Sequence, residues 1–342
     1  MEQTIGLTLG DPSGIGPELW VRVLCSRLNS LPDADGARLR LFGDAGVLER
    51  AAQQGGLAAE WRACLSKIEL VPVTSLSERE LRPGQPTAAS GAAQVAYLEA
   101  AIAEAAAGRL QGLCTAPLHK ASAHDAGLSF PGHTELLGAR LGRGEPAVMM
   151  LAGPSLRVAL ATVHLPLAAV ASALSEEGLV EVLVTTARAL HDDFGIAAPR
   201  LWVAGLNPHA GESGHFGDEE VRVIAPALAA ARLRTAEVPR LAGASFEGPL
   251  VPDALFRAAV HAPGSSRPDA VVAMYHDQGL IPLKLLDFDQ AVNITLGLRI
   301  IRTSPDHGVA HDIAGKWQAR PDSQSAALDL CLTLVRTRSR LR

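Results

Sequence analysis

Three histidines occupy equivalent places along the chain, each at or just after an apolar run that is typical of a buried strand. They are His164, at the end of 157–164; His209, after 201–206; and His276, after 271–275. Because parallel strands end at one edge of a sheet, these imidazoles could converge there. Three protein ligands with a position left open describe a catalytic divalent-metal site. For each histidine alone, an ordinary hydrogen-bonded side chain is the plainer alternative.

The stretch that contains the third histidine adds two charged groups. Asp277 follows His276 directly, and Lys284 lies eight positions beyond His276. Gly279 and Pro282 fall between them, so a short turn or a single helical turn is expected there. A metal ligand, a carboxylate and a cation would then lie in one region. A capped strand end with a surface lysine is the alternative.

A second cation follows at Arg302, in the sequence RTSPDHG, shortly after Asn293. Its planar, permanently charged guanidinium suits a phosphate or a carboxylate. With Lys284 it would give two cations near one crevice of a protein whose net charge is −5. A phosphorylated or carboxylated substrate is therefore expected.

Two further loops are rich in glycine, proline and hydrogen-bonding side chains: 115–120 (TAPLHK) and 130–135 (FPGHTE). Thr134 is expected to cap a helix there, and the exposed amides of a helix N-terminus favour an anion. Ordinary capping is the alternative. The loop at 10–18 (GDPSGIGPE) is glycine-rich but does not match GxGxxG, so it is weak evidence for a dinucleotide.

Composition narrows the class of protein. The 342 residues are 48% hydrophobic and 20% charged, which fits a globular chain of two domains. The longest basic run is the tail 336–342, expected to be a solvated helix end, so neither a nucleic-acid partner nor an anionic membrane is expected. The four cysteines lack CxxC spacing, and the first residues run into a strand pattern without a leader. Reduced thiols and a cytoplasmic location are expected.

One apolar stretch, 158–174, resembles a membrane span, but Pro166 would break a spanning helix. A buried strand followed by a buried helix is expected instead. Strand and helix patterns alternate along the chain, which predicts a doubly wound α/β fold without internal repeats. The expected strands are 5–9, 39–42, 68–73, 112–115, 147–151, 157–164, 201–206, 271–275 and 292–295. The expected helices are 18–28, 45–54, 88–107, 134–141, 167–173, 177–192 and 324–338.

The motifs together resemble those of the 4-hydroxythreonine-4-phosphate dehydrogenases of vitamin B6 synthesis. The matching segments are 10–18, 115–120, 131–135 (PGHTE), 162–167 (TVHLPL), 206–212 (LNPHAGE), 214–220 (GHFGDEE), 275–279 (YHDQG) and 302–315 (RTSPDHGVAHDIAG). The resemblance implies the isocitrate/isopropylmalate dehydrogenase-like fold, with an active-site cleft between two α/β/α domains. The first domain would span 1–130 plus 305–342. The second, 131–304, would carry the metal ligands and the dimer interface.

The resemblance also assigns residues to roles. It implies that the three histidines hold one divalent ion (zinc, magnesium or cobalt) at the interface of a homodimer. It implies that the substrate is contacted by His133, Thr134, Lys284, Asn293 and Arg302. Asp253 is similar to an acidic residue that lines the family's site. The segment 307–315 resembles the loop that holds the adenine end of the dinucleotide, through His307, Gly308, Asp312, Ala314 and Gly315.

The chain departs from the family at a few positions. Ser213 stands where a glycine is usual, and His311 and Trp317 replace the usual residues around the cofactor loop. The segment 262–268 lengthens the chain before Asp269. The changes near the cofactor loop leave NAD and NADP both open.

The residues and the resemblance agree on a reaction. The expected oxidoreductase oxidises 4-phosphooxy-L-threonine to a 3-keto acid, which loses CO2 to give 3-amino-2-oxopropyl phosphate on the route to pyridoxine 5'-phosphate. The metal would act as a Lewis acid, and the nicotinamide would accept the hydride. Asp253, Asp277 and Lys120 are unranked candidates for the general base. One alternative is a dehydrogenase of erythronate or threonate 4-phosphate. Another is a metal-dependent lyase or binding protein for phosphate compounds, without redox chemistry.

Overall fold

The computed structural model describes residues 3–27, 36–130 and 132–341. The chain forms two compact units: unit 1 comprises 1–141 with 298–336, and unit 2 comprises 142–297 with 337–342. Each unit combines helices with a sheet, which confirms the α/β class. His133, Thr134 and Arg302 lie in unit 1, although the expected ranges put them in the second domain. Within the described ranges, a search for helices with the length and apolar character of a bilayer span finds none.

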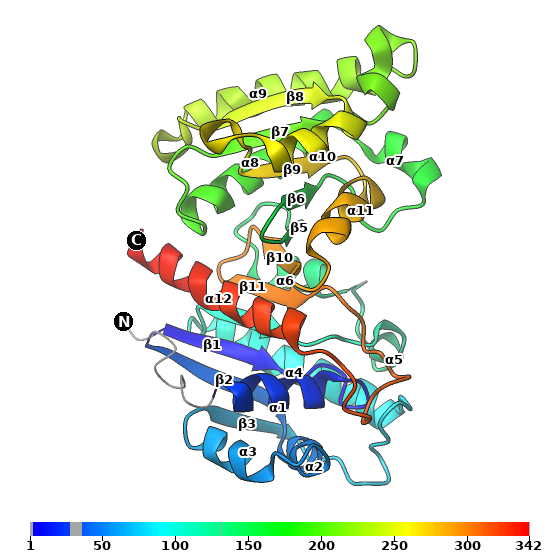
Figure 1. Ribbon diagram of the computed structural model, residues 1–342, viewed down its shortest axis with the longest axis vertical. Helices are drawn as coiled ribbons and strands as arrows, with labels where there is room; N and C mark the ends of the chain where they lie inside the picture. The colour runs from blue at the N-terminus through cyan, green and yellow to red at the C-terminus, as the bar shows by residue number, and fades with distance from the viewer. Residues whose placement is uncertain (1–2, 28–35, 131, 342) are drawn as a thin grey trace. The chain divides into compact units, whose positions relative to one another are not determined.

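Unit 1 contains a parallel sheet in the order β3-β2-β1-β4-β11 (Figure 1). Its strands are β1 (Gln3–Thr8), β2 (Ala37–Asp44), β3 (Glu69–Thr74), β4 (Gly112–Thr115) and β11 (Ile301–Pro305). All residues of β4 and β11 are buried, as expected for strands with helices on both faces. The sequence did not predict β11, because Arg302, Thr303 and Ser304 interrupt its apolar pattern.

Side-chain caps begin two of the helices of unit 1, α2 and α4. The full set is α1 (Gly16–Ser26), α2 (Ala45–Gln54), α3 (Ala58–Leu65), α4 (Ala88–Ala106), α5 (Lys120–Asp125), α6 (His133–Leu141) and α12 (Asp322–Arg340, which ends in unit 2). Asp44 accepts a hydrogen bond from the amide of Val47 at the start of α2. Thr87 and Ser90 form a reciprocal capping box at α4. The expected end of the first helix, at residue 28, lies outside the described residues.

Unit 2 contains a mixed sheet in the order β10-β5-β6-β9-β7-β8 (Figure 1). Its strands are β5 (Val148–Ala152), β6 (Arg157–Leu160), β7 (Arg200–Ala204), β8 (Ser245–Leu250), β9 (Ala270–Ala273) and β10 (Val292–Leu296). The pairs β10–β5 and β5–β6 are antiparallel, which the alternation of strands and helices did not indicate. The pairs β6–β9, β9–β7 and β7–β8 are parallel, so β9 is the buried parallel strand that its sequence predicted.

The helices of unit 2 include three that the sequence did not predict, α9, α10 and α11. The set is α7 (Leu167–Ala173), α8 (Glu176–Asp192), α9 (Ala225–Ala236), α10 (Pro252–His261) and α11 (His276–Asp287). Short segments with other helical hydrogen-bond patterns lie at Pro208–Gly214, Glu220–Ile224, Pro239–Leu241 and Gly264–Ser266, and the first of them has non-helical backbone angles inside it. Ser175 caps α8 by accepting from the amide of Gly178, and Glu176 and Glu177 fill its first turn.

Three local expectations were wrong. The stretch after His276 is not a short turn: α11 continues for 12 residues with Pro282 inside it. Helix α7 is mostly exposed, since Val170 is its one buried residue and Leu167 is 72% exposed. The C-terminal tail is not simply solvated, because the guanidinium of Arg338 is buried against the carboxylate of Asp193, with N–O distances of 2.6 and 2.8 Å.

Candidate active site

Three adjacent parallel strands of unit 2 lead to the three histidines. Strands β6, β9 and β7 lie side by side in that order (Figure 1). His164 comes shortly after the end of β6, His209 after β7, and His276 begins α11 just after β9. Because the three strands run in the same direction, the segments that carry the histidines leave the same edge of the sheet.

Two of these histidines lie together. The ring centroids of His164 and His276 are 5.7 Å apart, with an angle of 41° between the ring planes. Nδ1 of His276 lies 2.7 Å from a carboxylate oxygen of Asp277. A carboxylate at one ring nitrogen fixes the tautomer and leaves Nε2 available to a metal. His276 therefore has the environment of a metal ligand, with Asp277 as its positioning group.

His209 lies in a loop of unusual backbone geometry. Residues 209–213 all have positive φ, with values of 52°, 52°, 79°, 43° and 57°. This region is uncommon for residues other than glycine, and it includes Ser213. The buried carboxylate of Glu220 anchors the start of the loop by accepting from the amides of Leu206 and Asn207 and from the Asn207 side chain. Within the described residues, His209 does not join His164 and His276 in a compact group of three ligands.

Large apolar side chains near all three histidines are exposed. The set comprises Leu165 and Leu167 beside His164; Phe216 and Val221 after His209; and Ile281, Leu285, Leu286 and Phe288 on or at the end of α11. Leu285 is 83% exposed and Phe288 is 71% exposed. We call this set the apolar residues of unit 2. Exposed apolar side chains in such number are typical of a surface that another molecule covers.

A group of cations lies in unit 1, around Arg302 in β11. Its Nη2 donates a 2.8 Å hydrogen bond to Oγ1 of Thr115, at the end of β4, and Arg302 is only 2% exposed. Burial lowers the pKa of Arg302 to about 10, so it remains charged at neutral pH. Burial, followed by the positive charges of Arg302 and Lys120, lowers the pKa of His133 well below its ordinary value. Arg302, Lys120 and a neutral His133 thus form a group suited to an anion.

The other expected substrate contacts are divided between the units. Helix α6 begins at His133, so Thr134 lies in its first turn and is not the capping residue. Lys284 lies in the third turn of α11, and Asn293 lies in β10, both in unit 2. The buried Oδ1 of Asn293 has no hydrogen-bond partner. Lys284 and Arg302 therefore belong to different units.

The three candidate bases are all exposed. Asp253 lies in the first turn of α10, Asp277 follows His276 in α11, and Lys120 begins α5. Asp277 holds the imidazole of His276, whereas Lys120 belongs to the cation group around Arg302.

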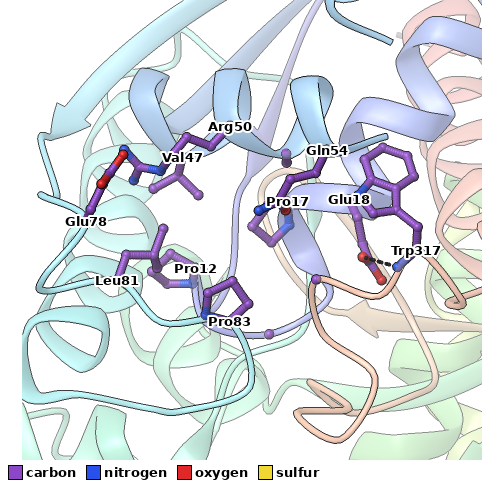
Figure 2. Close-up of a pocket in the computed structure, with 13 residues that line it drawn as sticks. Pro12, Pro17, Glu18, Val47, Arg50, Gln54, Glu78, Leu81, Pro83 and Trp317 are labelled. Atoms are coloured by element: carbon purple, nitrogen blue, oxygen red, sulfur yellow. Dashed lines mark hydrogen bonds between the residues drawn. The ribbon is translucent and has the colours of Figure 1, made fainter. Parts of the chain in front are cut away.

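The expected cofactor loop lies in unit 1, next to a cavity of about 240 Å³. Gly315 and Trp317 line this cavity together with Glu18 (Figure 2). Figure 2 shows Glu18 and Trp317 at one end and Arg50 and Glu78 at the other. One carboxylate oxygen of Glu18 accepts from the Trp317 amide at 3.1 Å, but its other oxygen and the indole Nε1 of Trp317 are buried without a hydrogen-bond partner among the described residues. Burial raises the pKa of Glu18.

The rest of the expected cofactor set lies earlier in the same loop. Ala314 is buried, and Gly308 and Asp312 are exposed. Nδ1 of His307 lies 3.0 Å from the carbonyl oxygen of Gly308. The sequence placed Trp317 around the cofactor loop but did not indicate that Glu18 lies beside it, because the two residues are almost 300 positions apart in the chain.

The fold and the polar side chains at its strand ends define a member of the α/β class of small-molecule enzymes, in which ligands bind at the carboxyl ends of strands. A family model described as pyridoxal phosphate biosynthetic protein PdxA matches residues 36–331. The chain belongs to this family.

The similarity to relatives extends over nearly the whole chain. The 4-hydroxythreonine-4-phosphate dehydrogenase of Burkholderia vietnamiensis is 45% identical, over 98% of this chain and 97% of that protein. The crystal structure of the enzyme of the same name from Klebsiella pneumoniae is 36% identical, with a TM-score of 0.81 over 98% of each chain. A terephthalate 1,2-cis-dihydrodioldehydrogenase from Burkholderia xenovorans is 30% identical, with a TM-score of 0.66 over 97% of this chain and 98% of its own.

Proposed function

We propose that the chain is an NAD- or NADP-dependent oxidoreductase that oxidises 4-phosphooxy-L-threonine at its 3-hydroxyl. The 3-keto acid product then loses CO2 to give 3-amino-2-oxopropyl phosphate for pyridoxine 5'-phosphate synthesis. The observation that carries the proposal is the paired histidines, His164 and His276, at the ends of neighbouring parallel strands. Full-length similarity to enzymes named for this reaction supports the substrate.

The donor set fits one divalent ion of the zinc, cobalt or magnesium kind. His164, His209 and His276 would hold it, and Asp277 orients the imidazole of His276 for that purpose. When bound, the ion supplies Lewis-acid chemistry at the substrate hydroxyl. Asp277 is engaged with His276, so it is a positioning carboxylate. Lys120 would carry its positive charge to the substrate phosphate, which leaves Asp253 as the candidate base.

The apolar residues of unit 2 support a homodimer with a shared site. They lie in the segments of the chain that follow the three histidines, and a second copy of the chain would bury them. His164 and His276 lie together in one chain, whereas in the part of the chain that the structure describes His209 does not form a compact group with them. We therefore assign His209 of the partner subunit as the third ligand of each site.

The cation group of unit 1 would bind the substrate phosphate. Arg302 is fixed by Thr115 and keeps its charge, and Lys120 adds a second positive charge. His133 is neutral, so it can donate one hydrogen bond without adding to the repulsion between the cations. Lys284, Thr134 and Asn293 complete the proposed substrate contacts, and the buried, unpartnered Oδ1 of Asn293 is suited to a donor such as the substrate amine.

The residues near 307–315 fit a dinucleotide. Glu18 and Trp317 line one cavity, and among the described residues each has a buried polar atom without a partner, an acceptor oxygen in Glu18 and the donor Nε1 in Trp317. The edge of adenine offers the complementary pair, an amino group and a ring nitrogen. His307, Gly308, Asp312, Ala314 and Gly315 would hold the adenine end of the cofactor, and Gly315 lines this cavity.

A substrate panel with NAD and NADP tests the proposal. We expect reduced nucleotide to form with 4-phosphooxy-L-threonine in the presence of metal, and much less with erythronate or threonate 4-phosphate. A higher rate with a tetronate phosphate would move the assignment to that substrate. If neither nucleotide binds the metal-loaded protein, the non-redox lyase or binding protein replaces the dehydrogenase.

A further inference from the structure

Three residues from distant parts of unit 1 bring metal-ligating atoms together. They are Asp11, in the loop between β1 and α1; His119, between β4 and α5; and His311, in the loop between β11 and α12. One ligand atom from each lies within 4.8 Å of the other two. We propose that this triad binds a second divalent transition-metal ion, of the zinc or cobalt kind, separate from the three histidines of unit 2.

The carboxylate of Asp11 is oriented for this role. Asp11 is fully buried, and its Oδ1 accepts from the amide of Ser13 at 2.9 Å and from the Ser13 hydroxyl at 2.6 Å. These bonds turn Oδ2 toward the triad, where Nε2 of His311 lies 2.9 Å away. A buried carboxylate needs a compensating positive charge. Within the described residues, His311 is the one basic side chain at ion-pair distance from Asp11.

The imidazole of His119 is held in place through its Nδ1 atom. Its Nδ1 lies 2.8 Å from Oγ of Ser122, which also accepts from the Gln94 amide at 2.9 Å. The Gln94 carbonyl in turn accepts from the backbone amide of His119 at 2.8 Å. A hydroxyl at Nδ1 leaves Nε2 of His119 as the ligand atom, the arrangement by which proteins orient metal-bound imidazoles.

The donor set selects the metal. Two imidazoles and one carboxylate are the protein ligands of one kind of catalytic zinc site, whose fourth position holds water or substrate, whereas magnesium and calcium prefer oxygen ligands. The rings of His119 and His311 meet edge to face, 4.8 Å apart at 69°, so they are not stacked flat against each other. A bound ion would supply the charge that buried Asp11 lacks, and it would tie the three segments of unit 1 together.

Cobalt titration of a chain without the other site tests the inference. In the double variant His164→Ala, His276→Ala, stripped of metal, we expect about one Co²⁺ to bind per chain, with the visible absorption of a low-coordinate cobalt centre. Adding His311→Leu should weaken Co²⁺ binding by about 10-fold or more. The matched control is His124→Leu, which removes an exposed histidine from α5 and should leave Co²⁺ binding unchanged.

Thermal unfolding with added Zn²⁺ gives a second measurement that does not depend on activity. Zn²⁺ should raise the Tm of the double variant, and the rise should disappear in His311→Leu and in His119→Ala. Far-UV circular dichroism of the metal-free variants, recorded in chelator, tests whether they are folded. Because the two variants change different ligands, a folding defect in one of them would leave the other as a valid test. If the double variant binds no Co²⁺, or if His311→Leu binds it as well as the parent, the triad is only a hydrogen-bonded contact between loops.

Discussion

The imidazoles of His164 and His276 lie with their centroids 5.7 Å apart, although a whole α/β segment that includes β7, α9 and β8 separates them in the chain. They are close because β6 and β9 pair in parallel, and each histidine comes soon after its strand. The same relationship explains why His276 is the first residue of α11: the strand ends at Ala273, and the helix that returns over the sheet begins three residues later.

His209→Ala should abolish turnover while the fold is kept. Loss of one of three ligands should reduce metal affinity or activity by at least about 10-fold to 100-fold. Metal content, rate and circular dichroism of the purified variant provide the check. Wild-type metal content together with a wild-type rate would mean that His209 is not a ligand.

Mixed dimers should show which chain supplies each ligand. Since His164 and His276 pair within one chain, a mixture of His209→Ala and His276→Ala chains should regain activity, with one intact site per heterodimer. A mixture of His164→Ala and His276→Ala chains should stay inactive, because each chain lacks one member of the pair. Subunit exchange is verified by tagging one chain. Recovery in the second mixture and not in the first would contradict the assignment of His209 to the partner subunit.

Arg302→Lys should reduce activity although the charge is unchanged. Lysine is a point charge, so it cannot donate to Thr115 and also offer two parallel bonds to a phosphate. A charge-assisted hydrogen bond contributes about 1.5–3 kcal/mol, so kcat/KM should fall roughly 10-fold to 150-fold. Oxidation of the unphosphorylated analogue, 4-hydroxythreonine, should be affected far less. Equal losses on both substrates would place Arg302 at the carboxylate or in a structural role.

His133 should make the protein less stable in mild acid. The pKa of His133 is lowered in the folded chain. Below pH 6.5, its ordinary pKa, this imidazole therefore binds a proton in the unfolded chain but not in the folded chain. The contribution of His133 should therefore lower the free energy of unfolding by about 1.4 kcal/mol for each pH unit below 6.5. His133→Gln, which cannot titrate, should show a flatter dependence in urea unfolding between pH 7 and pH 5. Parallel curves for the two proteins would show that His133 titrates normally.

Ser213→Gly should stabilise the chain. Ser213 has a φ of 57°, where a side chain costs roughly 1–2 kcal/mol, and it is exposed, so little packing is lost with the hydroxyl. The added freedom of glycine in the unfolded chain offsets part of the gain, so an increase of up to about 1 kcal/mol is expected in chemical denaturation. The control is Ser172→Gly in α7, which should be destabilising because glycine weakens a helix. No gain for Ser213→Gly would mean that this loop is not strained.

Much of the fold could be predicted from the sequence, because strand and helix periods are local properties. Helices α2 and α7 and strand β4 have the bounds that their patterns predicted. The helical character of the stretch after His276 was missed because Pro282 is a strong local signal against a helix, and packing of α11 on β6 and β9 outweighs it. The exposure of α7 was also missed, because an apolar helix at the surface can have the same sequence pattern as one inside the core.

By itself, the sequence determined which chemical groups the protein has: its family motifs, the three histidines at strand ends and the arginine at 302. Only the tertiary structure decided which of them meet. Strand pairing brings His164 to His276, and three loops bring Asp11, His119 and His311 together across nearly the whole chain. The physical reason is that residue type and period are encoded within a few neighbouring positions. Contact between distant residues depends instead on the order and direction in which strands pair, which no short stretch of sequence specifies.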